Sequence, residues 1–355
     1  MFLKKNKNKK QLNSKDRGRK SHKHSQKLIG LEVVKNVIRM VVIQGQEISY
    51  GEQLLEGTII KRDKLRNTEE LAAAMRALAK ELGASGGKVV YHLNNQTVLI
   101  QELDHIKDKS EQQIKDGLFL ELGDTISLPF STPKFELLLE DASKSVKKVS
   151  KRSSRKSEDE MDEAESPAQM SESLKYIVTS EEFLIELGDC LIQAGLKPAA
   201  VDFSALAYTR YFEQDINFDE IFLLVELSSG VATMTIFENS VPIYVQYEDY
   251  NGVGWRYFND EEKITYFFNA DKEVVEFKKL VMVIEQLTYY YQTSLSDNQE
   301  ISRIYVTGEH PWIATEQIVT LMVQTLQVPI SLLKVSSYFP AKYLLSVGLA
   351  MKEGQ

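Results

Sequence analysis

Residues 28–43 read LIGLEVVKNVIRMVVI, and residues 222–237 read FLLVELSSGVATMTIF. Each stretch predicts a strand, a tight turn and a second strand, with an acid near the end of the first strand. These acids are Glu32 and Glu226. Two copies of a strand–hairpin–strand–helix unit predict an α/β fold of mixed sheets, duplicated in two related lobes.

The rest of the chain predicts helices and strands that complete such lobes. Asn67 and Thr68 are expected to cap a helix that ends at Gly83, and Thr179 with Glu182 forms a capping-box pattern before a helix that ends at Gly195. Further helices are expected at 110–122, 273–295 and 315–326, and further strands at 48–55, 88–93, 97–103, 135–139, 176–178, 304–307 and 329–333.

Two stretches interrupt these patterns. Residues 1–27 hold eleven Lys/Arg and one acid, Asp16, so they carry +10 of a chain whose net charge is −8. Residues 143–173 hold a block of basic residues followed by a block of acidic ones. Such compositions predict disorder. The expected organisation is therefore a basic tail (1–27), a first lobe with an inserted subdomain (28–142), a charged insertion (143–173), and the end of the first lobe with the second lobe (174–352).

Several classes of protein are excluded by what the sequence lacks. No apolar run is long enough to span a bilayer, and the basic start has no apolar segment after it, so we expect no secretory signal. The single cysteine, Cys190, excludes a disulfide framework and is expected to be a buried, inert thiol in a reducing cytoplasm. The five histidines show no metal-ligand spacing, and no nucleotide-binding or serine-hydrolase motif occurs.

The ordered set of segments resembles the PilM family of type IV pilus assembly proteins, a branch of the actin-like proteins near the division protein FtsA. The matching segments are Ile29–Glu32, Leu128–Phe130 with Phe135–Leu139, Ala194–Pro198 with Ala200–Asp202, Gly230–Pro242, Ile304–Gly308 and Tyr343–Ala350. The resemblance implies an actin-like fold with two ribonuclease H-like subdomains and a nucleotide pocket between the lobes.

The resemblance also implies which residues border that pocket, and here the sequence departs from the family pattern. The implied pocket residues are Glu32, Lys35, Arg39, Glu226, Ser228, Gly230 and Gly308. Val34 and Ser228 stand at positions where the family has glycine, and Glu309 places a carboxylate beside a site for an anion. Both strand-end acids are Glu in place of Asp, which changes the placement of a Mg²⁺ ligand.

We therefore expect a degenerate pocket, weak or absent binding of ATP and Mg²⁺, and no enzymatic turnover. Lys35 and Arg39 could instead be exposed hairpin charges. Asp202 and Glu285 are possible pocket acids by position, but a cap or a helix surface is the alternative for each.

The function implied by the resemblance is a cytoplasmic scaffold at the inner face of the cell membrane. Its implied partners are the cytoplasmic tail of a PilN-like bitopic membrane protein and other pilus platform or motor proteins. The basic tail suits an anionic membrane surface, whereas specific nucleic-acid binding is not expected, because no aromatic residues interleave with the charges. The alternative is an actin-like ATPase of cell division or shape that retains ATP binding.

Overall fold

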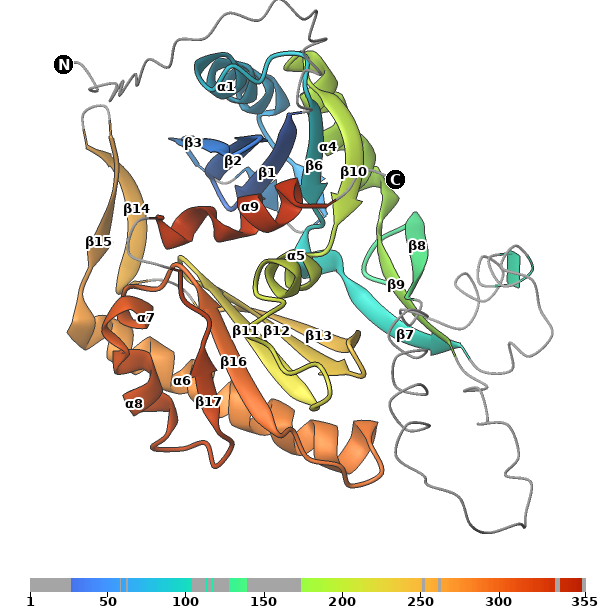
Figure 1. Ribbon diagram of the computed structural model, residues 1–355, viewed down its shortest axis with the longest axis vertical. Coiled ribbons are helices and arrows are strands. Elements are labelled where there is room, and N and C mark those ends of the chain that lie inside the picture. Colours follow the sequence, from blue (N-terminus) through green and yellow to red (C-terminus); the bar gives the residue numbers. More distant parts are fainter. Residues whose placement is uncertain are drawn as a thin grey trace, which may run out of the picture.

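The computed structural model describes residues 27–103, 113, 116–117, 128–138, 174–250, 253–260, 263–335 and 339–352, except for residues 58 and 62 (Figure 1). The predicted basic tail, the charged insertion and nearly all of the helix expected at 110–122 lie outside these residues. The described chain forms two lobes, and each lobe is built on a five-stranded mixed sheet.

The two sheets have the same topology. In each, three consecutive strands form an antiparallel meander, and the first of them pairs in parallel with a fourth strand, which pairs in parallel with a fifth. In the first lobe these strands are β1 (Leu28–Val34), β2 (Val37–Gln44), β3 (Glu47–Leu54), β6 (Lys88–His92) and β10 (Lys197–Asp202), and in the second lobe they are β11 (Phe222–Ser228), β12 (Val231–Glu238), β13 (Val241–Asp249), β16 (Arg303–Gly308) and β17 (Ile330–Leu332).

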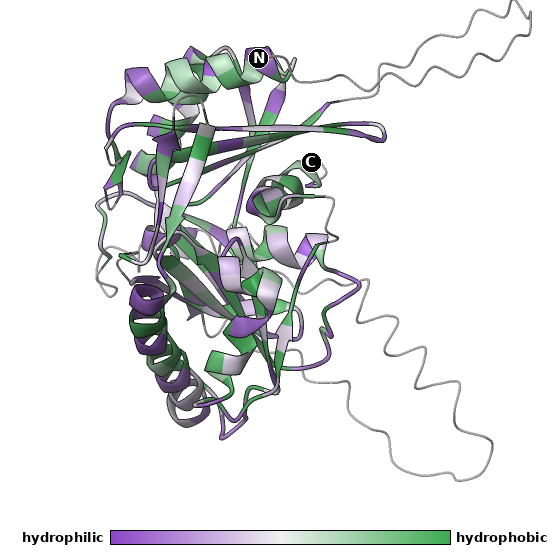
Figure 2. Cartoon of the chain, turned by 90° about the vertical axis from the view of Figure 1, so that its left-hand side faces the viewer, coloured by the Kyte–Doolittle hydropathy of each residue, from purple (hydrophilic) through white to green (hydrophobic). Residues whose placement is uncertain are grey.

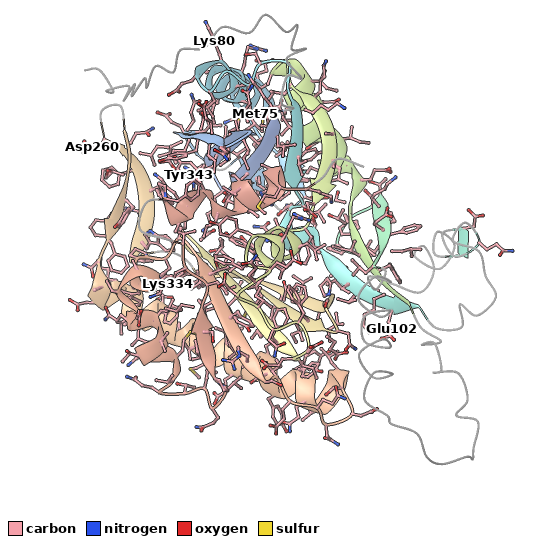
Figure 3. The ribbon with its side chains drawn as sticks, viewed as in Figure 1. Met75, Lys80, Glu102, Asp260, Lys334 and Tyr343 are labelled. Carbon is pink, nitrogen blue, oxygen red and sulfur yellow. The ribbon has the colours of Figure 1, made fainter. Side chains whose placement is uncertain are left out.

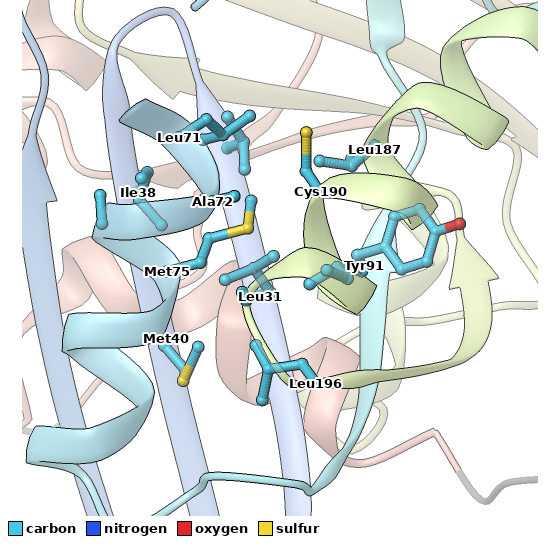
Figure 4. Packing of buried hydrophobic residues seen from close by; sticks show 14 of the residues in the cluster. Leu31, Ile38, Met40, Leu71, Ala72, Met75, Tyr91, Leu187, Cys190 and Leu196 are labelled. Carbon is cyan, nitrogen blue, oxygen red and sulfur yellow. The ribbon is translucent and has the colours of Figure 1, made fainter. Parts of the chain in front are cut away.

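Two helices cover the outer face of the first sheet, α1 (Thr68–Glu81) and α4 (Glu181–Gln193). Because side chains alternate between the faces of a strand, Ile29 and Leu31 of β1 point to these helices. Figure 4 shows this core, in which Leu31, Met75 and Cys190 pack together. Burial raises the pKa of the Cys190 thiol to about 11, so the thiol is unreactive, as the sequence predicts.

The long helix α6 (Ala270–Tyr290) covers the outer face of the second sheet in the same way. Leu223 and Val225 of β11 pack with Phe277 and Ile284 of α6. A single π-helical turn, Tyr291–Leu295, continues α6. Two shorter helices, α7 (Pro311–Thr315) and α8 (Gln317–Met322), complete this layer. In Figure 2 the strands of this lobe are mostly hydrophobic, whereas the long helix α6 carries both hydrophobic and hydrophilic residues.

Two further helices lie between the lobes, α5 (Ser204–Tyr211) and α9 (Leu344–Ala350), with a 3₁₀ turn at Ala341–Tyr343 before α9. Helix α9 packs directly on β1, because a Cβ on Gly30 would lie 1.8 Å from the carbonyl oxygen of Ser346. The faces of the two sheets that do not meet the outer helices therefore look toward each other across α5 and α9.

Smaller elements extend from both lobes. A three-stranded antiparallel sheet is attached to the first lobe, a two-stranded hairpin projects from the second, and short pieces join the larger elements (Figure 1). These elements are β7 (Leu99–Leu103), β8 (Pro133–Leu138) and β9 (Leu174–Ser180) in the small sheet, β14 (Trp255–Asp260) and β15 (Lys263–Phe268) in the hairpin, and β4 (Ile60–Lys61), β5 (Lys64–Leu65) and a 3₁₀ turn at Asn95–Thr97.

Some local predictions are wrong. Ser180, not Thr179, caps α4, because its hydroxyl accepts a hydrogen bond from the backbone N–H of Phe183 at 3.4 Å. Asn67 takes a left-handed conformation before α1 and makes no side-chain cap. The helix expected at 315–326 is shorter: α8 spans only Gln317–Met322, and Glu316, with a positive φ of 60°, separates it from α7.

Candidate functional site

A row of charged residues crosses the first sheet on the face that looks toward the second lobe. Glu32 of β1 lies opposite Arg39 of β2, and Arg39 lies opposite Glu52 of β3. Glu32 alternates with Leu31 and Val33, which point to the outer core, so its side chain points inward between the lobes. The strand register thus places an acid, a base and an acid side by side.

Arg39 is the centre of this row. Its side chain is buried, with 1% of its surface exposed. Its Nη1 lies 3.2 Å from Glu32 Oε1, its Nε lies 3.3 Å from Glu52 Oε2, and its Nη2 lies 2.7 Å from Glu309 Oε2. Although burial by itself lowers the pKa of a guanidinium, Glu309 and Glu32 hold the pKa of Arg39 well above its usual value. Arg39 is therefore a permanent cation with three carboxyl groups around its guanidinium.

The second lobe supplies Glu309 through a close approach of two strands. Gly308 ends β16 with φ +112°, and a Cβ at this position would lie 2.1 Å from the carbonyl oxygen of Leu227. Only glycine permits this approach. The next residue, Glu309, donates its N–H to Leu227 O at 2.9 Å and turns its carboxylate toward Arg39. The close packing of Gly308 against Leu227 is therefore enough to explain a glycine at this position, without a role in nucleotide binding.

Three more side chains complete this ionic cluster. The hydroxyl of Tyr257, from the β14–β15 hairpin, donates to Glu309, and the ring of Tyr257 lies 5.3 Å from the Arg39 guanidinium. Lys342 pairs with Glu52, and Ser346 Oγ donates to Glu32 Oε2 at 3.4 Å. In Figure 3, Tyr343, the neighbour of Lys342 in the sequence, is labelled between the lobes, and Asp260 is labelled at the tip of the β14–β15 hairpin. The cluster thus joins both lobes and the C-terminal helix.

Burial changes the protonation of Glu32. It raises the pKa of this carboxyl to about 7, and Arg39 opposes the rise. The carboxyl is therefore ionised only in part near neutral pH. To bind Mg²⁺, which prefers carboxylate oxygens, this carboxyl would have to release its proton and give up part of its contact with the Arg39 guanidinium.

The second sheet carries the equivalent row in an uncharged form. Glu226 of β11 lies opposite Thr233 of β12, and Thr233 lies opposite Tyr247 of β13. From the first lobe, Asn95 Nδ2 donates to Thr233 Oγ1 at 2.9 Å and to Ser204 Oγ at 2.8 Å. Burial raises the pKa of Glu226 to about 8, and a hydrogen bond with Ser204 opposes the rise. Glu226 is therefore mainly protonated at pH 7.

The turns of the two long hairpins touch each other. Lys35 Nζ lies 3.5 Å from the carbonyl oxygen of Gly230 and 3.6 Å from Asp249 Oδ1. The left-handed positions are Lys35 (φ 53°) in the first turn and Gly230 (φ 70°) in the second. Val34, which stands where the family has glycine, belongs to the extended strand β1 and needs no positive φ, so the valine does not strain the backbone at this position.

The space between the hairpins is small. A cavity of about 60 Å³ is lined by Lys35, His92, Glu226 and Ser228 among others. A second cavity, of about 290 Å³, is lined by the first turn with Arg39, Ser229, Arg256 and Glu309. Ligand pockets commonly measure about 300–1,000 Å³. The first cavity is far below this range, and the second lies at its lower edge.

The structure brings all seven residues of the sequence-based pocket to this region between the lobes. Glu32, Arg39 and Glu226 are buried there, and Lys35, Ser228, Gly230 and Gly308 lie at the strand ends around them. Their role toward a nucleotide stays a prediction. The alternative of an exposed hairpin charge is wrong for Arg39, which is buried, whereas Lys35 is partly exposed.

The two further acids considered from the sequence lie elsewhere. Asp202 Oδ2 lies 2.8 Å from Arg210 Nη2, and its Oδ1 lies 3.1 Å from Lys352 Nζ, so it is a structural ion-pair partner. Glu285 is exposed on α6.

Sequence reasoning missed several members of the site. Glu52 could have been found, because the predicted antiparallel strands place it opposite Arg39. Tyr257, Lys342, Ser346, Ser204 and Asn95 carry no local signal, because they arrive from elements far apart in the sequence.

Neither a metal cluster nor a bilayer-spanning helix is found in the part of the chain that the structure describes. Its His, Cys, Asp and Glu residues form no group of three able to hold a metal ion. None of its helices combines the length and hydrophobicity that crossing a bilayer requires.

Comparison with known proteins finds similarity in structure and not in sequence. No protein-family model and no curated protein matches this chain. A chain of the PilM–PilN type IV pilus biogenesis complex superposes with a TM-score of 0.64 at 15% identity, covering 92% of this chain and 98% of that chain.

Weaker matches include two proteins of other systems. The cytoplasmic domain of EpsL, an inner-membrane component of the type II secretion system of Vibrio cholerae, has a TM-score of 0.46 at 11% identity and covers 92% of this chain and 96% of its own. MreB5 of Spiroplasma citri bound to ADP has a TM-score of 0.45 at 9% identity, covering 92% and 95%. The resemblance to PilM expected from the sequence is confirmed at the level of the fold, and the chain has a two-lobed, actin-like architecture of the kind found in the PilM–PilN complex.

Proposed function

We propose that the protein is a cytoplasmic, actin-like scaffold of a type IV pilus or related secretion platform, which binds the cytoplasmic tail of a PilN-like bitopic membrane protein. The observation that carries this proposal is the match to a chain of the PilM–PilN complex over nearly the whole of both chains. The two chains share their fold over nearly their full lengths, and the described residues add no catalytic domain to it. Such a chain suits a protein that works by contact with other proteins.

The proposal includes a loss of useful ATP binding. Three carboxyl groups, those of Glu32, Glu52 and Glu309, surround Arg39, so the cation best placed for a phosphate is already neutralised. Burial favours the protonated carboxyl of Glu226, so this group would have to release a proton before it could bind Mg²⁺. Of the two cavities at the hairpins, the one of about 60 Å³ is too small for a triphosphate, and the one of about 290 Å³ has the Glu309 carboxylate in its lining. The residues present therefore do not fit Mg-ATP, and we assign the protein no catalytic step.

A direct binding measurement tests the scaffold role. The full chain is titrated by calorimetry with a peptide that carries the cytoplasmic tail of a PilN-like bitopic protein from the same organism, and with a scrambled peptide of the same composition. We expect saturable binding of the first peptide only. Equal binding of both peptides, or none up to about 1 mM, would contradict the proposal.

A nucleotide titration tests the second candidate function, an actin-like ATPase that retains ATP binding. The observation that favours this candidate is the cavity of about 290 Å³, which is lined by Lys35, Arg39 and Arg256. A ligand at 100 times its dissociation constant stabilises its protein by about 2.7 kcal/mol. We expect no shift of the melting temperature with millimolar Mg-ATP. A clear shift, lost in Lys35→Ala, would favour the ATPase.

Contact with the membrane is a separate part of the proposal. It rests on the charge of +10 in residues 1–27, since each basic residue near anionic headgroups contributes about 1 kcal/mol. The full chain is expected to sediment with vesicles that contain anionic lipid and not with neutral vesicles. Binding that survives deletion of residues 1–27 would remove the tail from the proposal.

A further inference from the structure

The outer face of α6 carries an apolar stripe that no part of the described chain covers. Val275, Met282 and Tyr289 are 54%, 56% and 67% exposed. They are spaced seven residues apart, so they form one line along the helix, about 21 Å long. Figure 2 shows hydrophobic and hydrophilic residues interleaved on this long helix of the second lobe. One exposed apolar position in each heptad gives a narrower seam than the two positions of a coiled coil, and it suits a short contact with another helix.

The charges beside the stripe show which kind of helix fits it. Lys278 and Glu285 lie on the same side of the stripe, about one turn before and one turn after Met282. Neither has an ion-pair partner among the residues that the structure describes, whereas the neighbouring Lys279 pairs with Glu276 at 2.8 Å. If a second copy of the helix runs in the opposite direction, its Glu285 comes opposite Lys278 and its Lys278 comes opposite Glu285.

We propose that two copies of this chain associate by antiparallel packing of their α6 helices around Met282. In this pair a two-fold axis passes beside Met282. The side of the stripe that carries Lys278 and Glu285 then meets the same side of the stripe in the second copy, so Lys278 of each copy faces Glu285 of the other. Val275 then packs against Tyr289 of the second copy. In a parallel pair the opposite sides meet, and Lys278 faces Lys279 of the second copy. The charges therefore select the antiparallel arrangement.

The area of contact sets the strength of this association. Three apolar residues from each copy give an interface in the small, transient class, below about 1,200 Å². The dimer is thus concentration-dependent and forms most readily where copies are gathered together. The stripe lies on the face of the second lobe away from Arg39, so pairing leaves the region between the lobes free. The inference is independent of the proposed function.

Sedimentation equilibrium of the full chain tests the association, with a charge swap as the decisive comparison. We expect dimerisation in wild type, a loss of at least about tenfold in affinity for Lys278→Glu, and recovery in Lys278→Glu with Glu285→Lys. Met282→Asp should be monomeric. The matched control is Val323→Asp, which changes an exposed apolar residue outside α6 and should dimerise as wild type does. A wild-type chain that stays monomeric at about 1 mM, or a double variant as weak as the single one, would overturn the proposal.

Cross-linking tests the direction of pairing. A disulfide needs Cα atoms within about 7 Å, and the natural Cys190 is buried, so wild type provides the background. Met282→Cys should link to itself. Val275→Cys should not link to itself but should link to Tyr289→Cys in a mixture of the two chains. Self-linking of Val275→Cys would establish a parallel pair and contradict the proposal.

Discussion

The two sheets use the same topology to hold opposite kinds of polar row. In the first sheet, Glu32, Arg39 and Glu52 form a buried row of charges that is completed by Glu309 from the other lobe. In the second sheet, the equivalent row of Glu226, Thr233 and Tyr247 has no cation, and its acid keeps a proton. The comparison teaches that a neighbouring guanidinium limits the rise in pKa that burial causes, since the pKa is about 7 for Glu32 beside Arg39 and about 8 for Glu226, which has no cation opposite it.

The largest expected effect comes from the cation of the charged row. Arg39→Met leaves the carboxyl groups of Glu32, Glu52 and Glu309 without the guanidinium between them. We expect the free energy of unfolding in urea to fall by about 3–5 kcal/mol. Thr233→Val changes the equivalent position of the uncharged row and should cost only about 1 kcal/mol. Equal losses of unfolding free energy in the two variants would contradict the view that the first sheet holds a row of charges and the second an uncharged row.

The pH dependence of stability sharpens the same comparison. The folded-state pKa of Glu226 is raised by burial to about 8, from 4.5, so between these values the folded protein holds a proton that the unfolded chain releases. Stability therefore falls as pH rises through this window and levels off above about pH 8. Glu226→Gln should be more stable than wild type at about pH 8, by about 1–3 kcal/mol, and similar to it at about pH 5.

Glu32→Gln is the matched variant in the charged row. The pKa of Glu32 is raised to about 7, against about 8 for Glu226, because Arg39 opposes the effect of burial, so Glu32→Gln should gain less stability over wild type at about pH 8 than Glu226→Gln does. Urea unfolding of both variants across the pH range measures these effects. A Glu226→Gln protein that keeps the full wild-type slope would disprove the assignment of the proton to Glu226.

The smallest expected effect lies at the contact between the hairpin turns. Lys35 and Asp249 are 35% and 54% exposed, so their ion pair is screened by water. Lys35→Ala should reduce stability by no more than about 1 kcal/mol, and the difference should shrink in about 1 M salt. A double-mutant cycle with Asp249→Ala measures the pair. A coupling above about 2 kcal/mol would make this contact, and not Arg39, the main connection between the lobes.

The strand pattern of the sequence predicted much of the site. The hairpin spacing placed Glu32 and Glu226 at equivalent positions, and the family resemblance implied Arg39 as a third pocket residue, whereas the charged row across the first sheet was not predicted. The β14–β15 hairpin was not predicted, because its residues 255–268 follow no clear alternation of apolar and polar side chains. The positive φ of Lys35 and of Glu316 was also missed, since these residue types rarely adopt it.

What the sequence determines by itself is the local order: two hairpins of alternating side chains, each with one acid near a turn, and helices with one apolar face. This order follows from strand and helix periodicity, which depends only on neighbours along the chain. The tertiary structure alone decides the charge state of the two acids. Arg39, Glu309 and Lys342 meet only when both lobes and α9 pack together, and burial by that packing is what raises the pKa of Glu32 and Glu226.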